Sequence, residues 1–269
     1  MRPSAAAVTR PRERPARSPA AAGRSGAAVV FLHGLGSSSG DWSMQSGPFS
    51  KQYRLRTLDL RGHGASRESP RRFTIEAFAA DVADALRRDG EPPAHVIGLS
   101  LGGCVGLALA LAAPDRVRSL TLVNAFAQLR PAGIRGAMKI SQRLALLCTA
   151  PMPTVARHVA RGLFPRPDQR EQYLAAVARL GSNPRWTYLA GMLALARFDV
   201  RARLADVRCP TLVVVADRDR TVPRSAGALL EREIPSARLE VIPDSGHATP
   251  YDQPEVFNRI VLDFLSRVP

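Results

Sequence analysis

The sequence predicts an α/β fold, in which a mostly parallel β-sheet carries helices on both faces and an all-helical cap is inserted into it. Three observations predict this class. Short apolar runs alternate with helix-length segments over most of the chain. The runs are continuous rather than alternating in polarity, which is typical of strands buried on both faces. From residue 126 to residue 207 the alternation stops and the pattern becomes helical throughout.

Composition and length favour a globular protein with a sizeable core. The chain has 269 residues, of which 45% are hydrophobic and 23% are charged. No apolar run approaches the roughly 18–20 residues that a membrane-spanning helix needs, so no membrane span is predicted. The net charge is +15, but the arginines are scattered and no aromatic residues alternate with them. Nucleic acid is therefore not predicted as a partner.

The cysteines predict neither a disulfide framework nor a zinc site. There are three of them, Cys104, Cys148 and Cys209, and no Cys-x-x-Cys pair occurs. Buried thiols in a reducing compartment are the simpler interpretation, and a cytoplasmic location is expected. Oligomeric state cannot be predicted from this pattern.

Residues 1–26 are predicted to be a disordered tail. The segment is rich in Arg, Pro and Ala, and after Met1 its only bulky aliphatic residue is Val8. Such a composition buries too little apolar surface to order itself. Ordered structure is therefore expected to begin at residue 27.

Six apolar runs are predicted to be strands, and three amphipathic or small-residue segments are predicted to be their helices. The strands are expected at 27–32, 55–58, 94–97, 119–123, 210–215 and 238–242. The helices are expected at 74–88, 101–113 and 254–265, the first with Thr74 as N-cap. Residues 27–125 and 208–269 would then form the core and residues 126–207 the cap.

The segment Gly98-Leu99-Ser100-Leu101-Gly102 joins a predicted strand to a predicted helix and fits G-x-S-x-G. A serine at such a sharp turn has a strained backbone, and side chains two residues before and after it would collide. Glycine at both positions removes the collision and leaves the hydroxyl projecting above the sheet. Ser100 is therefore the predicted nucleophile.

A serine nucleophile needs a base, and the base needs an orienting carboxylate. His247 follows the last predicted strand near the C-terminus, at the sheet edge where sites gather, and is the predicted base. Asp217 and Asp219 both follow the strand before it. Spacing alone does not choose between them, because successive residues leaving a strand point in different directions.

Two backbone amides are predicted to hold the developing oxyanion. One belongs to Leu101, directly after the nucleophile. The other belongs to Leu35, in the loop after the first strand, where Gly34 and Gly36 let the backbone turn. A phosphate-binding glycine loop is disfavoured because neither a Lys nor G-x-G-x-x-G follows.

With these features in place, the sequence resembles the α/β-hydrolase superfamily over about residues 27–267. The resemblance is carried by HGLGSS at 33–38, DLRGHGAS at 59–66, GLSLGG at 98–103, PDRV at 114–117, ADRDRTVP at 216–223 and Gly246-His247. The family places its acid four residues before the proline of the fifth motif, which selects Asp219 and leaves Asp217 in reserve. The DLRGHGAS segment resembles a structural loop of the family.

Within the superfamily, the chain resembles small esterases and 3-oxoadipate enol-lactonases, through Leu99, the helical cap and residues 197–201. The resemblance implies hydrolysis of a small carboxylic ester or lactone through an acyl-enzyme on Ser100, with no metal or organic cofactor. The alternatives are an acyltransferase or perhydrolase with the same triad, and a ligand-binding member without activity. Candidate pocket residues from the cap are Phe126, Met138, Leu147, Trp186 and Met192.

The sequence departs from the family in one respect. Members usually begin with a β-hairpin ahead of the first motif, but the 26 preceding residues here show no strand alternation. The expected sheet therefore has six strands rather than eight, with a less protected edge.

Overall fold

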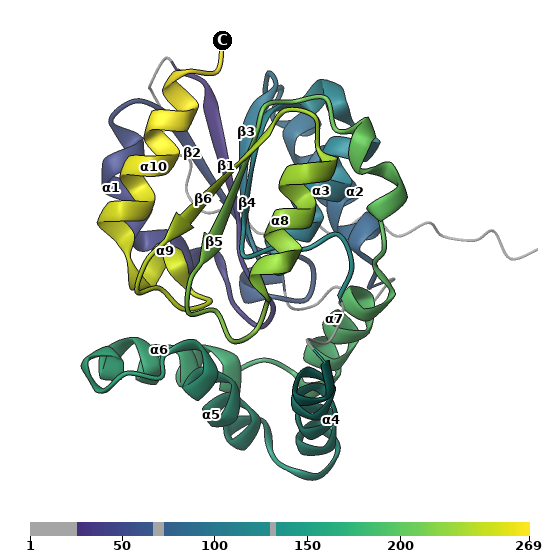
Figure 1. The fold of residues 1–269 in the computed structure, drawn as a ribbon, viewed down its shortest axis with the longest axis vertical. Helices are drawn as coiled ribbons and strands as arrows, with labels where there is room; N and C mark the ends of the chain where they lie inside the picture. Colours follow the sequence, from purple (N-terminus) through teal and green to yellow (C-terminus); the bar gives the residue numbers. More distant parts are fainter. Residues whose placement is uncertain (1–25, 67–72, 130–132) are drawn as a thin grey trace, which may run out of the picture.

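A computed structural model of the chain describes residues 26–66, 73–129 and 133–269 (Figure 1). Apart from Gly26, the N-terminal segment predicted to be disordered lies outside the described residues. Within the described residues, no helix is long and apolar enough to cross a membrane.

The described residues form one six-stranded sheet in which every neighbouring pair of strands is parallel, with the order β2-β1-β3-β4-β5-β6. The predicted strands are confirmed, each within two residues of its expected ends. Their bounds are β1 Ala28–Leu32, β2 Arg54–Leu58, β3 Ala94–Leu99, β4 Val117–Val123, β5 Thr211–Ala216 and β6 Ala237–Ile242. Every residue of β1, β3 and β5 is buried, which explains why their sequences are apolar except for His95 and Thr211.

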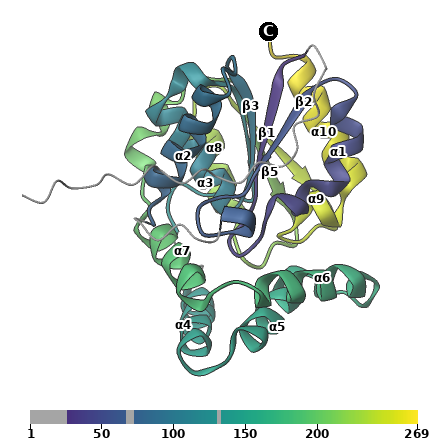
Figure 2. The same ribbon diagram turned by 180° about the vertical axis from the view of Figure 1, so that it is seen from behind.

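Helices cover both faces of this sheet, as Figures 1 and 2 show from opposite sides. One face carries α1 (Ser43–Ser50) and α10 (Pro254–Ser266), with the short α9 (Thr249–Asp252) before α10. The other face carries α2 (Ile75–Arg88), α3 (Leu101–Ala112) and α8 (Arg224–Glu233). Thr74 caps α2 as predicted, since its side chain accepts from Ala77 N. Helices α1 and α8 were not among the predicted elements.

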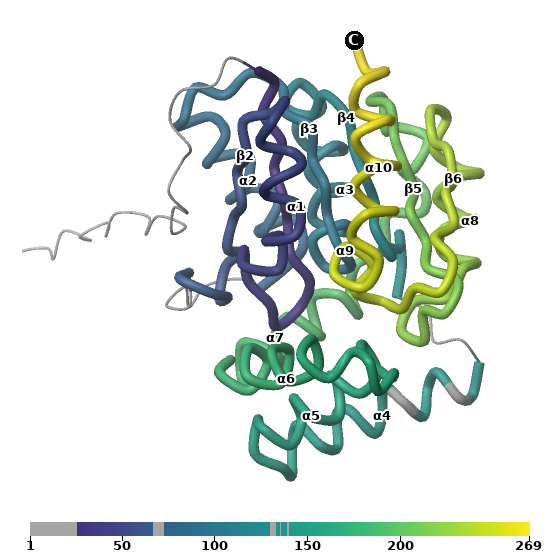
Figure 3. Tube along the Cα trace, turned by 90° about the vertical axis from the view of Figure 1, so that its left-hand side faces the viewer, coloured from purple at the N-terminus to yellow at the C-terminus, as the bar shows by residue number. Residues whose placement is uncertain are grey.

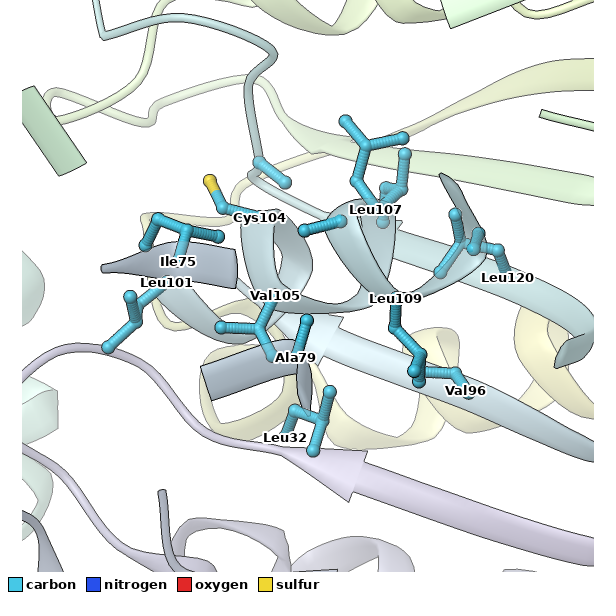
Figure 4. Close-up of a cluster of buried hydrophobic side chains, with 14 of the residues drawn as sticks. Leu32, Ile75, Ala79, Val96, Leu101, Cys104, Val105, Leu107, Leu109 and Leu120 are labelled. Carbon is cyan, nitrogen blue, oxygen red and sulfur yellow. The ribbon is translucent and has the colours of Figure 1, made fainter. Parts of the chain in front are cut away.

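Helix α3 begins at the predicted nucleophile and is buried along almost its whole length. In the cluster shown in Figure 4, Leu109 of α3 lies beside Val96 of β3, and Val105 of α3 points towards Leu32 of β1. All four side chains have no exposed surface. This packing fixes the helix on the sheet, and with it the turn that precedes the helix.

Within the described residues, the cap contains four α-helices: α4 (Gly133–Thr149), α5 (Met152–Leu163), α6 (Arg170–Gly181) and α7 (Arg185–Arg197). They lie together at one end of the sheet, below it in Figure 1 and again in the side view of Figure 3. Where the chain leaves and re-enters the core, Gln128 pairs with Asp199 in an antiparallel bridge, and Val200 N donates to Ala127 O (3.0 Å).

Short 3-10 helices complete the described secondary structure at Ser39–Trp42, Gly64–Ser66, Pro114–Arg116, Pro167–Gln169 and Arg201–Asp206. The sheet reverses its direction of growth between β1 and β3, because β2 lies on the other side of β1. In open α/β sheets, ligands bind at such a switch point, beyond the carboxyl ends of the strands. The loops that follow β1 and β3 here contain Leu35 and Ser100.

Candidate active site

Ser100 occupies the sharp turn between β3 and α3. Its backbone angles are φ 53° and ψ −110°, a region that a non-glycine residue adopts only under strain. The surroundings hold this conformation, since Ser100 N donates to Val123 O (2.8 Å) and Ser100 O accepts from Cys104 N (3.0 Å). The residue is the N-cap of α3 and only 9% exposed. Strained residues of this kind are concentrated at active sites, so the conformation supports Ser100 as a reactive group.

The two glycines around Ser100 are required by close backbone contacts. A Cβ placed on Gly98 would lie 2.3 Å from Gly102 O, and one placed on Gly102 would lie 2.1 Å from Leu32 O. Neither contact can be relieved by a side-chain rotation, because both neighbours are backbone atoms. The turn therefore brings the start of α3 directly against the end of β1.

The loop after β1 lies beside the nucleophile. A Cβ on Gly34 would lie 3.9 Å from Ser100 Cβ. His33 holds this loop, because its Nδ1–H donates to Gly34 O (2.8 Å) and its Nε2 accepts from Leu60 N (3.0 Å). Burial lowers the pKa of His33 to about 3, so the imidazole is neutral and serves the backbone. Leu35 lines the cavity next to this loop.

Leu101 lies on the other side of Ser100, as the first residue of α3. The first N–H groups of a helix have no acceptor within the helix, so its amide is available to a ligand. Leu101 as a whole residue has no exposed surface, and it does not line the cavity that Ser100 lines. The amides of Leu35 and Leu101 remain the predicted oxyanion donors.

His247 and Asp219 form a buried pair. The imidazole Nδ1 lies 2.7 Å from Asp219 Oδ2, and the two side chains are 8% and 2% exposed. The other carboxylate oxygen, Oδ1, accepts from Thr221 N (2.6 Å) and Val222 N (3.1 Å). These bonds orient the carboxylate, which in turn fixes the imidazole with Nδ1 as donor and Nε2 as acceptor.

Asp217, the alternative acid, is used differently. Its Oδ1 accepts from Ser245 N (3.1 Å), two residues before His247, and Arg218 N donates to Ser245 O (3.0 Å). Asp217 therefore braces the backbone of the histidine loop, while Asp219 contacts the imidazole itself. The geometry favours Asp219 as the acid that the resemblance selected.

One cavity of about 830 Å³ brings these groups together. Ser100, Asp219 and His247 line it, with Leu35 and other residues of the loop after β1. Its walls also include residues of every cap helix: Ile140 and Arg143 of α4, His158 and Val159 of α5, Gln172 and Ala176 of α6, and Met192 and Leu193 of α7. Among the described residues, no three His, Cys, Asp or Glu side chains come together as a metal ligand set.

Of the five cap positions predicted to form the pocket, the structure places two on its wall. Phe126 and Met192 line the cavity, whereas Met138, Leu147 and Trp186 do not. Leu147 is 1% exposed inside the core of the cap, and the Met138 side chain is 65% exposed. Trp186 is half exposed and stacks edge-on against Phe73, with ring centroids 5.4 Å apart. Whether a cap residue lines the cavity depends on which way the apolar face of its helix is turned. Helical periodicity identifies that face but does not predict its direction.

The cap holds the loop after β1 through α6 and α7. Asn183, between the two helices, donates from Nδ2 to Gly36 O (2.7 Å). A Cβ on Gly36 would lie 2.8 Å from the Tyr188 ring, and one on Gly191 would lie 2.4 Å from Leu35. The residues flanking the Leu35 amide are thus packed against the cap.

The cap also holds the histidine loop. Asp252, whose side chain is 2% exposed, accepts from Gly246 N (2.6 Å) and pairs with Arg166 Nη2 (3.3 Å). Gln169 donates to the same carboxylate. Arg166 and Gln169 belong to the connection between α5 and α6. Sequence reasoning missed this contact and that of Asn183, because both depend on how the cap sits on the core.

Asn124 is another functional candidate that sequence reasoning missed. It directly follows β4, is 2% exposed, and has a φ of 46°. Its side chain bonds to both the strand that leads to Asp219 and the loop that carries His247. An asparagine at the carboxyl end of a central strand was the only signal in the sequence.

Comparison with known proteins agrees with this architecture. Residues 27–254 match the family described as alpha/beta hydrolase fold. The chain belongs to the α/β-hydrolase family. The expected fold, with its parallel sheet and helical cap, is confirmed, and the match spans the serine turn, the acid and the histidine.

Two curated relatives are similar over most of their length. The chain is 32% identical to the "Putative carbamate hydrolase RutD" of Azorhizobium caulinodans, with 90% of this chain and 92% of the relative covered. It is 30% identical to 3-oxoadipate enol-lactonase 1 of Acinetobacter baylyi, with coverages of 90% and 89%. One relative is named as a hydrolase and the other as a lactonase, which supports an enzymatic role for this α/β-hydrolase.

Solved structures show the same likeness. A hydrolase from Pseudomonas aeruginosa PA01 superposes with a TM-score of 0.81 at 31% identity, covering 89% of this chain and 90% of the other. The enol-lactonase from Burkholderia xenovorans LB400 superposes with a TM-score of 0.83 at 25% identity, with coverages of 91% and 93%.

Proposed function

We propose that this α/β-hydrolase cleaves a small carboxylic ester or lactone through an acyl-enzyme on Ser100. The observation that carries the proposal is the pairing of His247 with Asp219 at 2.7 Å in the wall of the cavity that also contains Ser100 at its strained turn. Nucleophile, base and orienting acid are the three parts that this chemistry needs. The relatives named as an enol-lactonase and a carbamate hydrolase support a hydrolytic outcome.

The reaction follows from the roles of these groups. His247 takes the proton of the Ser100 hydroxyl at Nε2 as Oγ attacks the substrate carbonyl, while Asp219 holds Nδ1–H. The amides of Leu35 and Leu101 donate to the oxyanion of the tetrahedral intermediate. His247 then gives its proton to the leaving alkoxide, which departs as the alcohol. A water molecule, deprotonated by the same imidazole, releases the acid and restores Ser100.

The substrate binds between the core and the cap. We assign residues 126–207 to the cap and residues 27–125 and 208–269 to the core, with the Gln128–Asp199 bridge at the boundary. The cavity of about 830 Å³ is large enough for a small ester or lactone, and cap residues such as Phe126 and Met192 form part of its wall.

A carbamate is the second candidate substrate class, favoured by the name of the relative that is 32% identical. Its carbonyl can be attacked by the same serine, and the same amides can hold its oxyanion. Transfer of the acyl group to an alcohol, a thiol or peroxide instead of water is the alternative outcome of the acyl-enzyme. Product analysis in the presence of competing acceptors separates transfer from hydrolysis.

The decisive test is Ser100→Ala, assayed on p-nitrophenyl esters of increasing chain length, lactones and carbamates. We expect turnover of the best substrate to fall by about 10³-fold or more, because only the oxyanion amides and binding remain. Ser119→Ala is the matched control: Ser119 is also buried, but it lies on β4 and bonds to His95 (2.7 Å) away from the cavity. Full activity of Ser100→Ala would refute the assignment of the nucleophile.

A further inference from the structure

The carboxyl end of β4 bonds to the serine turn, to the strand that precedes Asp219 and to the loop that carries His247. Val123 O accepts from Ser100 N (2.8 Å), so the last residue of β4 holds the nucleophile's backbone. The next residue, Asn124, bonds to the strand that precedes Asp219 and to the loop that carries His247. Its backbone N–H donates to Val214 O of β5 (2.9 Å), which extends the sheet pairing by one step.

The Asn124 side chain connects the acid strand to the histidine loop. Its Oδ1 accepts from Ala216 N (2.9 Å), at the end of β5 and three residues before Asp219. Its Nδ2 donates to His247 O (2.8 Å) and to Thr249 Oγ1 (2.8 Å). All the hydrogen-bonding groups of the amide except one lone pair of Oδ1 are used.

These partners also fix which way the amide faces. Ala216 N can only donate and His247 O can only accept, so a flipped amide would place like groups together. The Thr249 hydroxyl donates to Gly246 O (3.0 Å) and is left to accept from Asn124. The backbone is also suited to this residue, because asparagine tolerates a φ of 46° better than most side chains.

We propose that Asn124 is a positioning residue for catalysis, which holds the backbone of His247 in place relative to the strand that leads to Asp219. The inference rests on the proposed function of the triad. Asp219 fixes the imidazole at Nδ1, but the ring can be aimed at Ser100 only if the backbone that carries it is fixed as well. Asn124 supplies that second point of attachment from the centre of the sheet.

The effect on catalysis follows from what removal of the amide would leave. His247 O would lose its bond from Asn124 in a buried site, and the loop could shift to find another donor. A displacement of about 1 Å in a catalytic group can cost about 10²-fold in rate. Asn124 does not line the cavity, so substrate binding should change little.

Two variants test the role. Asn124→Gly removes all three side-chain bonds and suits the positive φ, and Asn124→Asp keeps the shape and the Oδ1 acceptor but places a carboxylate oxygen against His247 O. For p-nitrophenyl ester hydrolysis, with rates normalised to titrated active sites, we expect kcat to fall about 10- to 100-fold in both variants. We expect KM to stay within about threefold of wild type.

A double-mutant cycle separates positioning from a purely structural role. If Asn124 acts through His247, Asn124→Gly should have almost no further effect on the residual activity of His247→Ala. If the loss persists in full in that background, the inference is wrong. It is also wrong if both single variants retain kcat within about threefold of wild type.

Asn258→Ala provides the matched control. Asn258 is also a buried asparagine, with bonds to Gln45 Nε2 (3.1 Å) and Met44 O (3.2 Å), but it lies on α10 outside the cavity wall. We expect it to lower the midpoint of thermal unfolding and leave kcat unchanged.

Ser100→Ala separates failure of the proposed function from failure of the inference about Asn124. If Ser100→Ala keeps activity, the proposed function fails. If it is inactive while the Asn124 variants are normal, this inference alone fails.

Discussion

Gly102→Ala tests whether the serine turn depends on backbone contact between α3 and β1. The new Cβ would lie 2.1 Å from Leu32 O and 2.8 Å from His33 O, where ordinary contacts begin near 3.4 Å. Helix and strand must therefore separate by more than about 1 Å, and this shift moves Ser100 relative to the loop that contains Leu35. We expect kcat/KM to fall about 10²-fold or more. Overpacking should lower the free energy of unfolding by about 1–3 kcal/mol.

The matched control is Gly106→Ala, one turn further along the same buried helix. A Cβ there would meet only side-chain methyls, Leu120 Cδ1 at 3.0 Å and Val96 Cγ1 at 3.2 Å, which can give by a few tenths of an ångström. Alanine also favours the helix by about 1 kcal/mol over glycine. We expect wild-type kcat/KM for this variant, measured by ester hydrolysis with urea unfolding in parallel. Gly102→Ala activity within about threefold of wild type would refute the steric argument.

Further predictions concern the acid and the buried histidines. Asp219→Asn should lower kcat about 10³- to 10⁴-fold. Asp217→Asn should lower kcat less than about tenfold, because an amide oxygen can still accept from the histidine loop. Equal losses of kcat in the two variants would contradict the assignment of Asp219 as the acid. Burial lowers the pKa of His33 to about 3 and that of His95 to about 4, so the unfolded chain binds more protons below the ordinary value of 6.5. The free energy of unfolding should fall as pH drops from 6.5 towards 4, by up to about 1.4 kcal/mol per pH unit for each histidine, and His95→Gln should reduce that slope in urea titrations. An unchanged slope in this variant would show that His95 is not buried in its neutral form.

Much of the core could be predicted because its determinants are local. A strand such as β5 is buried on both faces, so its sequence is apolar after Thr211. The serine turn needs glycine at fixed positions because backbone approaches backbone. The identity of the acid was harder to predict. Asp217 and Asp219 both follow the same strand, and only the resemblance to the family selected one of them. Their different partners in the structure, Ser245 N and the His247 imidazole, show what spacing could not.

The remaining site residues depend on contacts between distant segments. Asn124 bonds to a residue 123 positions away, and Asn183 bonds to one 147 positions away. No local pattern specifies such partners. The same reason explains why Leu147 and Trp186 were expected on the cavity wall: helical periodicity identifies an apolar face but does not say whether it faces the cavity, the core of the cap or a neighbour such as Phe73.

The two contacts between cap and core limit how this enzyme can be re-engineered. A chimaera whose transplanted cap lacks residues equivalent to Asn183 and Arg166 loses the donor to Gly36 O and the cation beside Asp252. The transplanted segment would then alter the loops that hold the proposed oxyanion donor and base, besides changing the shape of the cavity. Chimaeras that keep Asn183 and Arg166 should therefore separate the effect of a new pocket from the effect of a loosened catalytic loop.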